Sequence, residues 1–175
     1  MELKGKKVIL LVENEYEDLE LWYPKLRLIE AGAKVTVAGV GEEIYYSKHG
    51  YPATVDGEIK DFKPNDFDAV VIPGGWAPDR MRRYPELVNF VREMNDLGKV
   101  IAAICHGPSV LISAGILKGK KATCVIAIKD DVINAGAEYL DESVVVDGNL
   151  ITSRTPSDLP DFCREIIKAL KYPKG

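Results

Sequence analysis

The sequence has little of what several classes of protein require. Its 175 residues include only three cysteines and two histidines, and their scattered positions do not offer the ligand spacing of a metal site. Lys and Arg number 23 against 27 Asp and Glu, for a formal net charge of −4, whereas nucleic-acid surfaces need clustered positive charge. No apolar run approaches the ~20 residues of a membrane span. These shortages argue against binding of metals, nucleic acids or membranes.

The cysteine pattern also argues against a disulfide framework. Cys105, Cys124 and Cys163 cannot all pair with one another, and none lies in a CxxC arrangement. The first residues lead straight into a strand-like segment, without the apolar region and cleavage site of a signal peptide. Because disulfides are rare in reducing compartments, we expect a cytoplasmic protein with free thiols.

Strand-like and helix-like segments alternate along the chain. Apolar runs typical of buried strands lie at residues 7–12, 34–38, 68–73, 99–104 and 121–125. Helices are predicted at 17–31, 86–97, 108–114, 130–134 and 155–170. The first helix should be kinked or divided at Pro24, residues 43–59 form a small strand excursion, and 143–152 form a hairpin. This alternation predicts a mostly parallel sheet wrapped by helices.

The segment that carries chemistry follows the fourth predicted strand. There the chain reads Ala103-Ile104-Cys105-His106-Gly107-Pro108 and passes directly into a helix. Sites in open parallel sheets form beyond the carboxyl ends of strands, and a polar residue at a sharp strand-to-helix turn is typical of a nucleophile elbow. A helix N-terminus also favours thiolate over thiol. We therefore predict that Cys105 is a nucleophile, whereas Cys124 and Cys163 occupy ordinary core positions.

Two histidines are candidates for the base. His106 directly follows Cys105, but neighbouring side chains usually point apart, so its ring needs the unusual backbone of an elbow to approach the sulfur. His49 lies in the strand excursion and is interpreted as a structural or rim-lining residue. We take His106 as the base.

Two other strand ends lead to the same edge of the predicted sheet. After the first strand comes an acidic loop at residues 13–18, where a carboxyl group, Glu15 above all, can hydrogen-bond the sulfur and share its titration. Glu17 and Asp18 are better explained as caps of the next helix. After the third strand, Gly74-Gly75 offers backbone N–H groups for an oxyanion hole suited to acyl chemistry.

These residues resemble the PfpI intracellular proteases, in the ThiJ/PfpI branch of the class I glutamine-amidotransferase-like fold. The resemblance spans about residues 7–170, and its motifs are Asn14-Glu15-Tyr16-Glu17-Asp18, Lys48-His49-Gly50-Tyr51, Pro73-Gly74-Gly75-Trp76-Ala77-Pro78, Ile104-Cys105-His106-Gly107-Pro108, Ile112-Ser113-Ala114-Gly115, Lys129-Asp130-Asp131 and Ser153-Arg154. It implies one domain over residues 1–175 with a flavodoxin-like three-layer sandwich. No cofactor and no metal are implied.

The resemblance also implies roles for individual residues. Cys105 would be the nucleophile, His106 its partner and Glu15 the carboxyl beside the thiol, while Gly75 would contribute to the oxyanion hole. The family assembles through dimers, commonly into hexamers. In its proteases an acid just after the Ala-Pro pair, usually Glu, completes a triad from a neighbouring subunit. Here that position is Asp79, which keeps the charge but reaches one methylene less.

Several functions fit this pattern. The leading hypothesis is a cysteine hydrolase, an ATP-independent peptidase acting on amide bonds. The alternative is a stress-response deglycase or glyoxalase acting on methylglyoxal or glyoxal adducts, which uses the same thiolate and oxyanion hole. A non-enzymatic chaperone or a cysteine oxidation sensor is a further alternative. A flavin-binding module is disfavoured, because the acidic loop at 13–18 would repel the phosphate usually held there.

Overall fold

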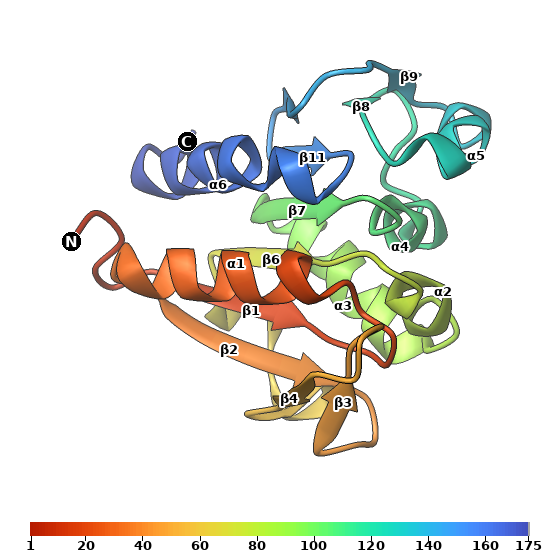
Figure 1. Ribbon diagram of the computed structural model, residues 1–175. Coiled ribbons are helices and arrows are strands. Elements are labelled where there is room, and N and C mark those ends of the chain that lie inside the picture. Colours follow the sequence, from red (N-terminus) through yellow and green to blue (C-terminus); the bar gives the residue numbers. More distant parts are fainter. Residues whose placement is uncertain (175) are drawn as a thin grey trace.

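The computed structural model describes residues 1–174 and has a central sheet of seven strands (Figure 1). The strand order is β10-β11-β7-β6-β1-β2-β5. Every neighbouring pair runs parallel except β10 and β11, which are antiparallel. The sheet strands are β1 (Lys7–Leu11), β2 (Lys34–Gly39), β5 (Gly57–Glu58), β6 (Ala69–Ile72), β7 (Val100–Ile104), β10 (Val145–Asp147) and β11 (Leu150–Ser153).

Two small pairs of strands lie outside this sheet. An antiparallel hairpin joins β3 (Ile44–Tyr46) to β4 (Pro52–Thr54), and a parallel pair joins β8 (Lys121–Ala122) to β9 (Glu138–Tyr139). Both pairs project from the central layer, at opposite sides of the molecule in Figure 1. The first pair belongs to the predicted excursion at residues 43–59.

Helices cover both faces of the sheet. α1 and α6 lie side by side on one face, while α3 packs against β6 and β7 on the other (Figure 1). The α-helices are α1 (Asp18–Glu30), α2 (Ala77–Met81), α3 (Pro85–Asp96), α4 (Pro108–Ala114), α5 (Lys129–Asn134) and α6 (Leu159–Lys171). Short 3₁₀ turns are η1 (Ile59–Asp61), η2 (Pro64–Asp66), η3 (Ile126–Ile128) and η4 (Pro156–Asp158). The predicted three-layer α/β fold with a mostly parallel sheet is confirmed.

Three local predictions differ from the structure. Residues 121–125 do not add a strand to the central sheet, because only Lys121–Ala122 pair, and they pair with β9. At Pro24, where the helix was expected to be kinked or divided, division is ruled out because α1 continues through this residue. α2 was missed, because five residues with one proline carry too little periodicity to predict a helix.

The core of the sheet is apolar on both sides, as a doubly covered parallel sheet requires. In β1 the residues Val8 to Leu11 have no solvent exposure, and β6 and the inner part of β7 are equally buried. No helix among residues 1–174 has the length and apolar character of a membrane span. The rigid sheet brings the carboxyl ends of β1, β6 and β7 side by side at one edge.

The two faces of α1 give a test of this packing. Leu28 is fully buried under the helix, whereas Leu26, two residues away, is 59% exposed. Leu28→Ala should lower the free energy of unfolding by about 2–5 kcal/mol, because it leaves a cavity in the core. Leu26→Ala in the same helix should change it by no more than about 0.5 kcal/mol. Urea denaturation measures both, and equal losses would contradict this orientation of α1.

Candidate active site

Cys105 lies in the tight connection between β7 and α4, one residue after the strand ends. Its φ angle is +64°, in the left-handed region that side-chain-bearing residues rarely adopt. The backbone holds it there, since its N–H donates to the carbonyl of Ser153 at 3.0 Å and its carbonyl accepts from the N–H of Val125 at 3.0 Å. A strained residue fixed in this way is typical of a functional position. The predicted nucleophile elbow is therefore present in the backbone.

Two glycines allow the backbone to close around the thiol. A Cβ atom on Gly107 would lie 2.7 Å from the carbonyl oxygen of Ile72, and one on Gly74 would lie 2.7 Å from the Cβ of Cys105. Neither clash can be relieved by turning a flexible side chain, because backbone or Cβ atoms are involved. Glycine at these positions thus sets the narrow geometry of the site.

The carboxyl group beside the thiol is Glu20, and the prediction of Glu15 at this position is wrong. Oε1 of Glu20 accepts a 2.8 Å hydrogen bond from the Gly74 N–H, and both this oxygen and the Cys105 side chain lie next to Gly74. Glu15 instead has a φ angle of +64° and pairs with Arg80 at 3.2 Å, half exposed. Glu15 lies in the loop between β1 and α1, whereas Glu20 lies in the first turn of α1. The first turn of α1 therefore supplies the acid.

A sequence signal for Glu20 was available. Glu17 caps α1, accepting from the backbone N–H groups of Leu19 and Glu20, so the helix begins at Asp18. Glu20 then shares a face with Pro24 and Leu28, both buried, at a spacing of four residues. An acidic residue on the buried stripe of a helix is unusual, and this anomaly points to the acid beside the thiol.

Glu20 keeps its proton near neutral pH. Burial raises the pKa of Glu20 to about 8, the negative charge of Glu17 adds to the rise, and the hydrogen bonds from Gly74 and Cys105 oppose it. Its Oε2 atom is buried and has no hydrogen-bond partner among residues 1–174. A protonated Oε2 can therefore donate to the sulfur when Cys105 becomes a thiolate.

The helix terminus was predicted to favour the thiolate of Cys105. The environment of Cys105 in the structure acts in the opposite direction. Burial, and then the negative charge that Glu20 carries when ionised, raise the pKa of Cys105 to about 12. The seven-residue helix α4 begins with a proline, which lacks an N–H group, and so contributes little positive field. Backbone N–H groups of His106 and Gly75 hydrogen-bond to the sulfur and oppose the rise. Ionisation of Cys105 and Glu20 at the same time is therefore disfavoured.

The same two N–H groups point to where an oxyanion can bind. The N–H of the residue after a nucleophile and one from a neighbouring loop form the oxyanion hole of an elbow, and here these belong to His106 and Gly75. Gly75 has a φ angle of +74° and forms a bridge with Tyr16, which fixes its direction. Gly74, predicted as a second donor, is not free for this role because its N–H is bonded to Glu20.

His106 is positioned to remain a neutral base. Burial, and then the positive charge of Lys48, lower the pKa of His106, while Asp79 of the same chain opposes them. Its ring lies 5.3 Å from that of Trp76, centroid to centroid, at 44°. Asp79 itself pairs with Arg83 at 3.0 Å.

A pocket of about 420 Å³ opens beside the thiol elbow. Its lining residues are Gly75, Trp76, Asp79, Arg82, His106, Ser109, Ile128 and Asp131. This volume is within the range of small-molecule sites. The predicted residues Gly75, Asp79 and His106 are thus brought together around one cavity, and Glu15 is not.

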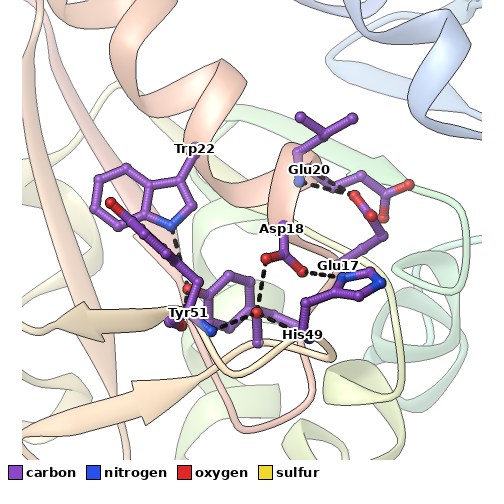
Figure 2. Close-up of polar contacts among 9 residues, drawn as sticks. Glu17, Asp18, Glu20, Trp22, His49 and Tyr51 are labelled. Atoms are coloured by element: carbon purple, nitrogen blue, oxygen red, sulfur yellow. Dashed lines mark hydrogen bonds and ion pairs between the residues drawn. The ribbon is translucent and has the colours of Figure 1, made fainter.

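Lys48, to which the sequence analysis gave no role of its own, lies next to His49 on a loop that is held against α1; Figure 2 shows His49 beside Asp18 of α1. Asp18 accepts a 2.7 Å hydrogen bond from the Ser47 hydroxyl and lies 2.9 Å from Nδ1 of His49. The backbone N–H of Lys48 donates to Tyr16 at 2.9 Å. The positive charge of Lys48 acts on three groups of the site, lowering the pKa of Glu20, Cys105 and His106.

His49 is therefore a supporting residue of this loop. Its side chain is 73% exposed, and its Nδ1 faces Asp18, so it is not directed at the thiol. Figure 2 shows the His49 ring beside the Asp18 carboxylate. The other oxygen of that carboxylate accepts the hydrogen bond from the Ser47 hydroxyl. The arrangement agrees with a role at the rim of the site.

An open α/β sheet with a buried cysteine elbow, two facing amides and a protonated glutamate defines a class of cysteine-dependent enzymes. The chain belongs to the DJ-1/PfpI family, whose model matches residues 6–169. It is 49% identical over 165 residues to the deglycase PfpI of Pyrococcus furiosus, covering 94% of this chain and 99% of that protein. The same identity and coverage hold for a deglycase of Pyrococcus horikoshii. The chain is thus similar to cysteine-dependent hydrolases and deglycases.

Solved structures agree with this assignment. A two-domain protein of Anabaena variabilis, with a DJ-1/ThiJ/PfpI-like and a ferritin-like domain, superposes with a TM-score of 0.94 at 50% identity, over 96% of this chain and 49% of that one. DJ-1β of Drosophila melanogaster gives a TM-score of 0.90 at 32% identity, over 95% and 90% of the two chains. Among residues 1–174 no cluster of three potential metal ligands occurs.

The protonated state of Glu20 has a measurable consequence for stability. Since burial raises the pKa of Glu20 from 4.5 to about 8, the folded protein holds a proton between these values that the unfolded chain has released. Stability should therefore fall as pH rises from about 5 to 8, by at most about 1.4 kcal/mol per pH unit. Glu20→Gln should lack this fall, and urea denaturation from pH 5 to 9 measures the difference. If the difference in unfolding free energy between the wild-type protein and Glu20→Gln stayed constant with pH, Glu20 would ionise in the folded protein as it does in the unfolded chain.

Proposed function

We propose that the protein is a cysteine-dependent deglycase that removes small dicarbonyl adducts from amines and thiols. The observation that carries the proposal is the Cys105 elbow, whose sulfur faces two backbone N–H groups and the Glu20 carboxyl. Its neighbours Gly75 and His106 line a pocket sized for a small molecule. Relatives that are about half identical over nearly their whole length, including those of Pyrococcus furiosus and Thermococcus kodakarensis, are named deglycases. Their name supports the choice of substrate.

The reaction is a hydrolysis with an internal rearrangement and needs no outside oxidant. A methylglyoxal adduct, CH₃–CO–CH(OH)–X–R with X a sulfur or an amine nitrogen, takes up one water. The products are lactate and the free thiol or amine, HX–R. The carbonyl carbon is reduced to an alcohol and the neighbouring carbon is oxidised to a carboxylate, so electrons balance within the substrate. The site must therefore supply a nucleophile, an oxyanion site and proton transfer.

The named residues can fill these roles. The Cys105 sulfur attacks the carbonyl carbon of the substrate, and the C=O π bond breaks as its electron pair moves to oxygen. Neutral His106 accepts the thiol proton as the C–S bond forms. The oxyanion then lies against the N–H groups of Gly75 and His106, which already face the sulfur. Glu20, protonated near neutral pH, donates a hydrogen bond to the sulfur whenever it carries negative charge. Lys48 adds a positive charge near the same atoms.

A second candidate is the peptidase activity of the leading sequence hypothesis. It is favoured by the Cys105–His106 pair together with Asp79. The charge of Asp79 raises the pKa of His106, which is the effect that a cysteine protease requires of the acid beside its histidine. Both activities begin with attack of the same sulfur at a carbon bearing oxygen. A parallel assay on fluorogenic peptides therefore accompanies the deglycase assay below.

We also propose that the working form is a homo-oligomer in the cytoplasm. α1 exposes Leu19, Tyr23 and Leu26, at 56%, 36% and 59%, on the face turned away from the sheet, and an apolar stripe at this spacing fits a second subunit. The three cysteines are free, in keeping with a reducing compartment. Asp79 lies at the mouth of the pocket, where it can serve His106 of its own chain or of a neighbour.

The proposed activity predicts which thiol is essential. Cys105→Ala should abolish lactate release from the methylglyoxal adduct of N-acetylcysteine, while Cys124→Ala and Cys163→Ala should retain most of it. The reason is that Cys105 is partly exposed, whereas the other two thiols are at most 1% exposed. Lactate formation measures the effect. Full lactate release by Cys105→Ala would refute the proposal, and peptide cleavage without lactate release would favour the peptidase.

Asp79 can be tested by pH profile and by subunit mixing. Since Asp79 raises the pKa of His106, Asp79→Asn should reduce turnover several-fold and move the acidic limb of the kcat/KM profile to lower pH. Asp130→Asn, on α5 and outside the pocket lining, serves as the control. If Asp79 acts across subunits, mixing inactive Cys105→Ala chains with Asp79→Asn chains should restore part of the activity. An unshifted profile would remove Asp79 from the mechanism, and mixing without recovery would confine it to its own chain.

A further inference from the structure

Two charged side chains of opposite sign line the Cys105 pocket without an ion-pair partner among residues 1–174. Arg82 ends α2, and Asp131 lies in the first turn of α5. The two helices contact α4 from different sides (Figure 1), so the two charges come from separate walls of one cavity. No ion pair within 4.0 Å joins them.

The Arg82 guanidinium is held in place but not neutralised. Its Nε donates a 2.9 Å hydrogen bond to the hydroxyl of Ser113 on α4, which fixes the plane of the group. Nη1 and Nη2 make no hydrogen bond to any of residues 1–174. A guanidinium anchored at Nε presents its remaining donors as a fork that matches a carboxylate.

The other charges of the pocket are already accounted for. Asp79 pairs with Arg83 at 3.0 Å, and His106 stays neutral because its pKa is lowered by burial. Asp131 has no hydrogen bond to its carboxylate and no cation within ion-pair distance in the described chain. One positive and one negative group are thus left facing the same space of about 420 Å³.

We infer that the site takes small zwitterions, namely adducts on the side chains of free amino acids, with Arg82 binding the α-carboxylate and Asp131 the α-ammonium group. The inference rests on the proposed function, since it takes the Cys105 pocket as the substrate site. An adduct on an internal residue of a protein has its α-nitrogen and α-carbonyl in peptide bonds and brings neither charge. Such an adduct would gain no charge-assisted contact from either Arg82 or Asp131, both of which are exposed.

Binding can be measured apart from catalysis with a stable substrate mimic. S-(2-hydroxypropyl)cysteine is a zwitterion whose thioether replaces the labile hemithioacetal and which does not cyclise. Acetylating its nitrogen gives an anion, amidating its carboxyl gives a cation, and making both changes gives a neutral molecule. All have nearly the same shape. Each probe should slow the alkylation of Cys105 by iodoacetamide when it fills the pocket, and the concentration dependence gives its Kd.

We expect the zwitterion to bind the wild-type protein at least about tenfold more tightly than the neutral probe, as two charge-assisted contacts allow. Arg82→Met should remove the advantage of probes with a carboxylate, and Arg82→Lys should retain part of it. Asp131→Asn should remove the advantage of probes with an ammonium group. Asp130→Asn, on the same helix, and the remote Arg164→Met are matched controls and should keep both preferences.

Equal protection by all four probes in the wild-type protein would overturn the inference. An unchanged preference in Arg82→Met or Asp131→Asn would overturn the role of that side chain. Because protection reports binding alone, its failure is separable from failure of the proposed function. A protein that prefers the zwitterion but releases no lactate would refute the deglycase and keep the inference, whereas lactate release without any preference would refute the inference alone.

Discussion

The site depends on one buried contact, the Glu20 carboxyl group between the Gly74 amide and the Cys105 thiol. It requires α1 to begin at Asp18, a residue without a side chain at Gly74 just after β6, and a left-handed residue at Cys105 just after β7. These three elements are held in register by the parallel pairing of β1, β6 and β7. A carboxyl group buried this deeply is stable only with its proton or with a donor on each oxygen. The Gly74 N–H satisfies one oxygen, and the unmatched second oxygen is the one available to the sulfur.

This contact explains why a thiol of high pKa can still react. Burial and Glu20 oppose the free thiolate, so the negative charge on the sulfur needs partners that act during the reaction. Once a substrate brings developing negative charge onto the sulfur and oxygen, the amides of Gly75 and His106 and the proton of Glu20 all become favourable partners. These groups stabilise the charged reacting state more than the neutral resting state, which is the differential binding that catalysis needs.

Much of the fold could be predicted from the sequence, because buried parallel strands carry long runs of branched apolar residues and the elbow carries a compact motif. The choice between Glu15 and Glu20 could not be made from motif position alone. It needs the buried stripe of α1 as well, on which Glu20 lies with Pro24 and Leu28. Residues 121–125 have the composition of a strand, but Val125 is committed to the Cys105 carbonyl and Thr123 to the Thr152 hydroxyl. Tertiary contacts therefore override the local propensity there.

The left-handed backbone of Cys105 has a consequence for how the protein can be made more robust. The angle of +64° is imposed on a residue that would relax out of it in isolation, and the hydrogen bonds to Ser153 and Val125 hold it against that tendency. Replacing the cysteine by glycine would relieve the torsion and leave those two bonds in place, so the inactive protein should outlast the active one on heating. Screens that select only for thermal stability would therefore favour loss of the nucleophile. The sequence keeps Cys105 even though glycine would make this position more stable.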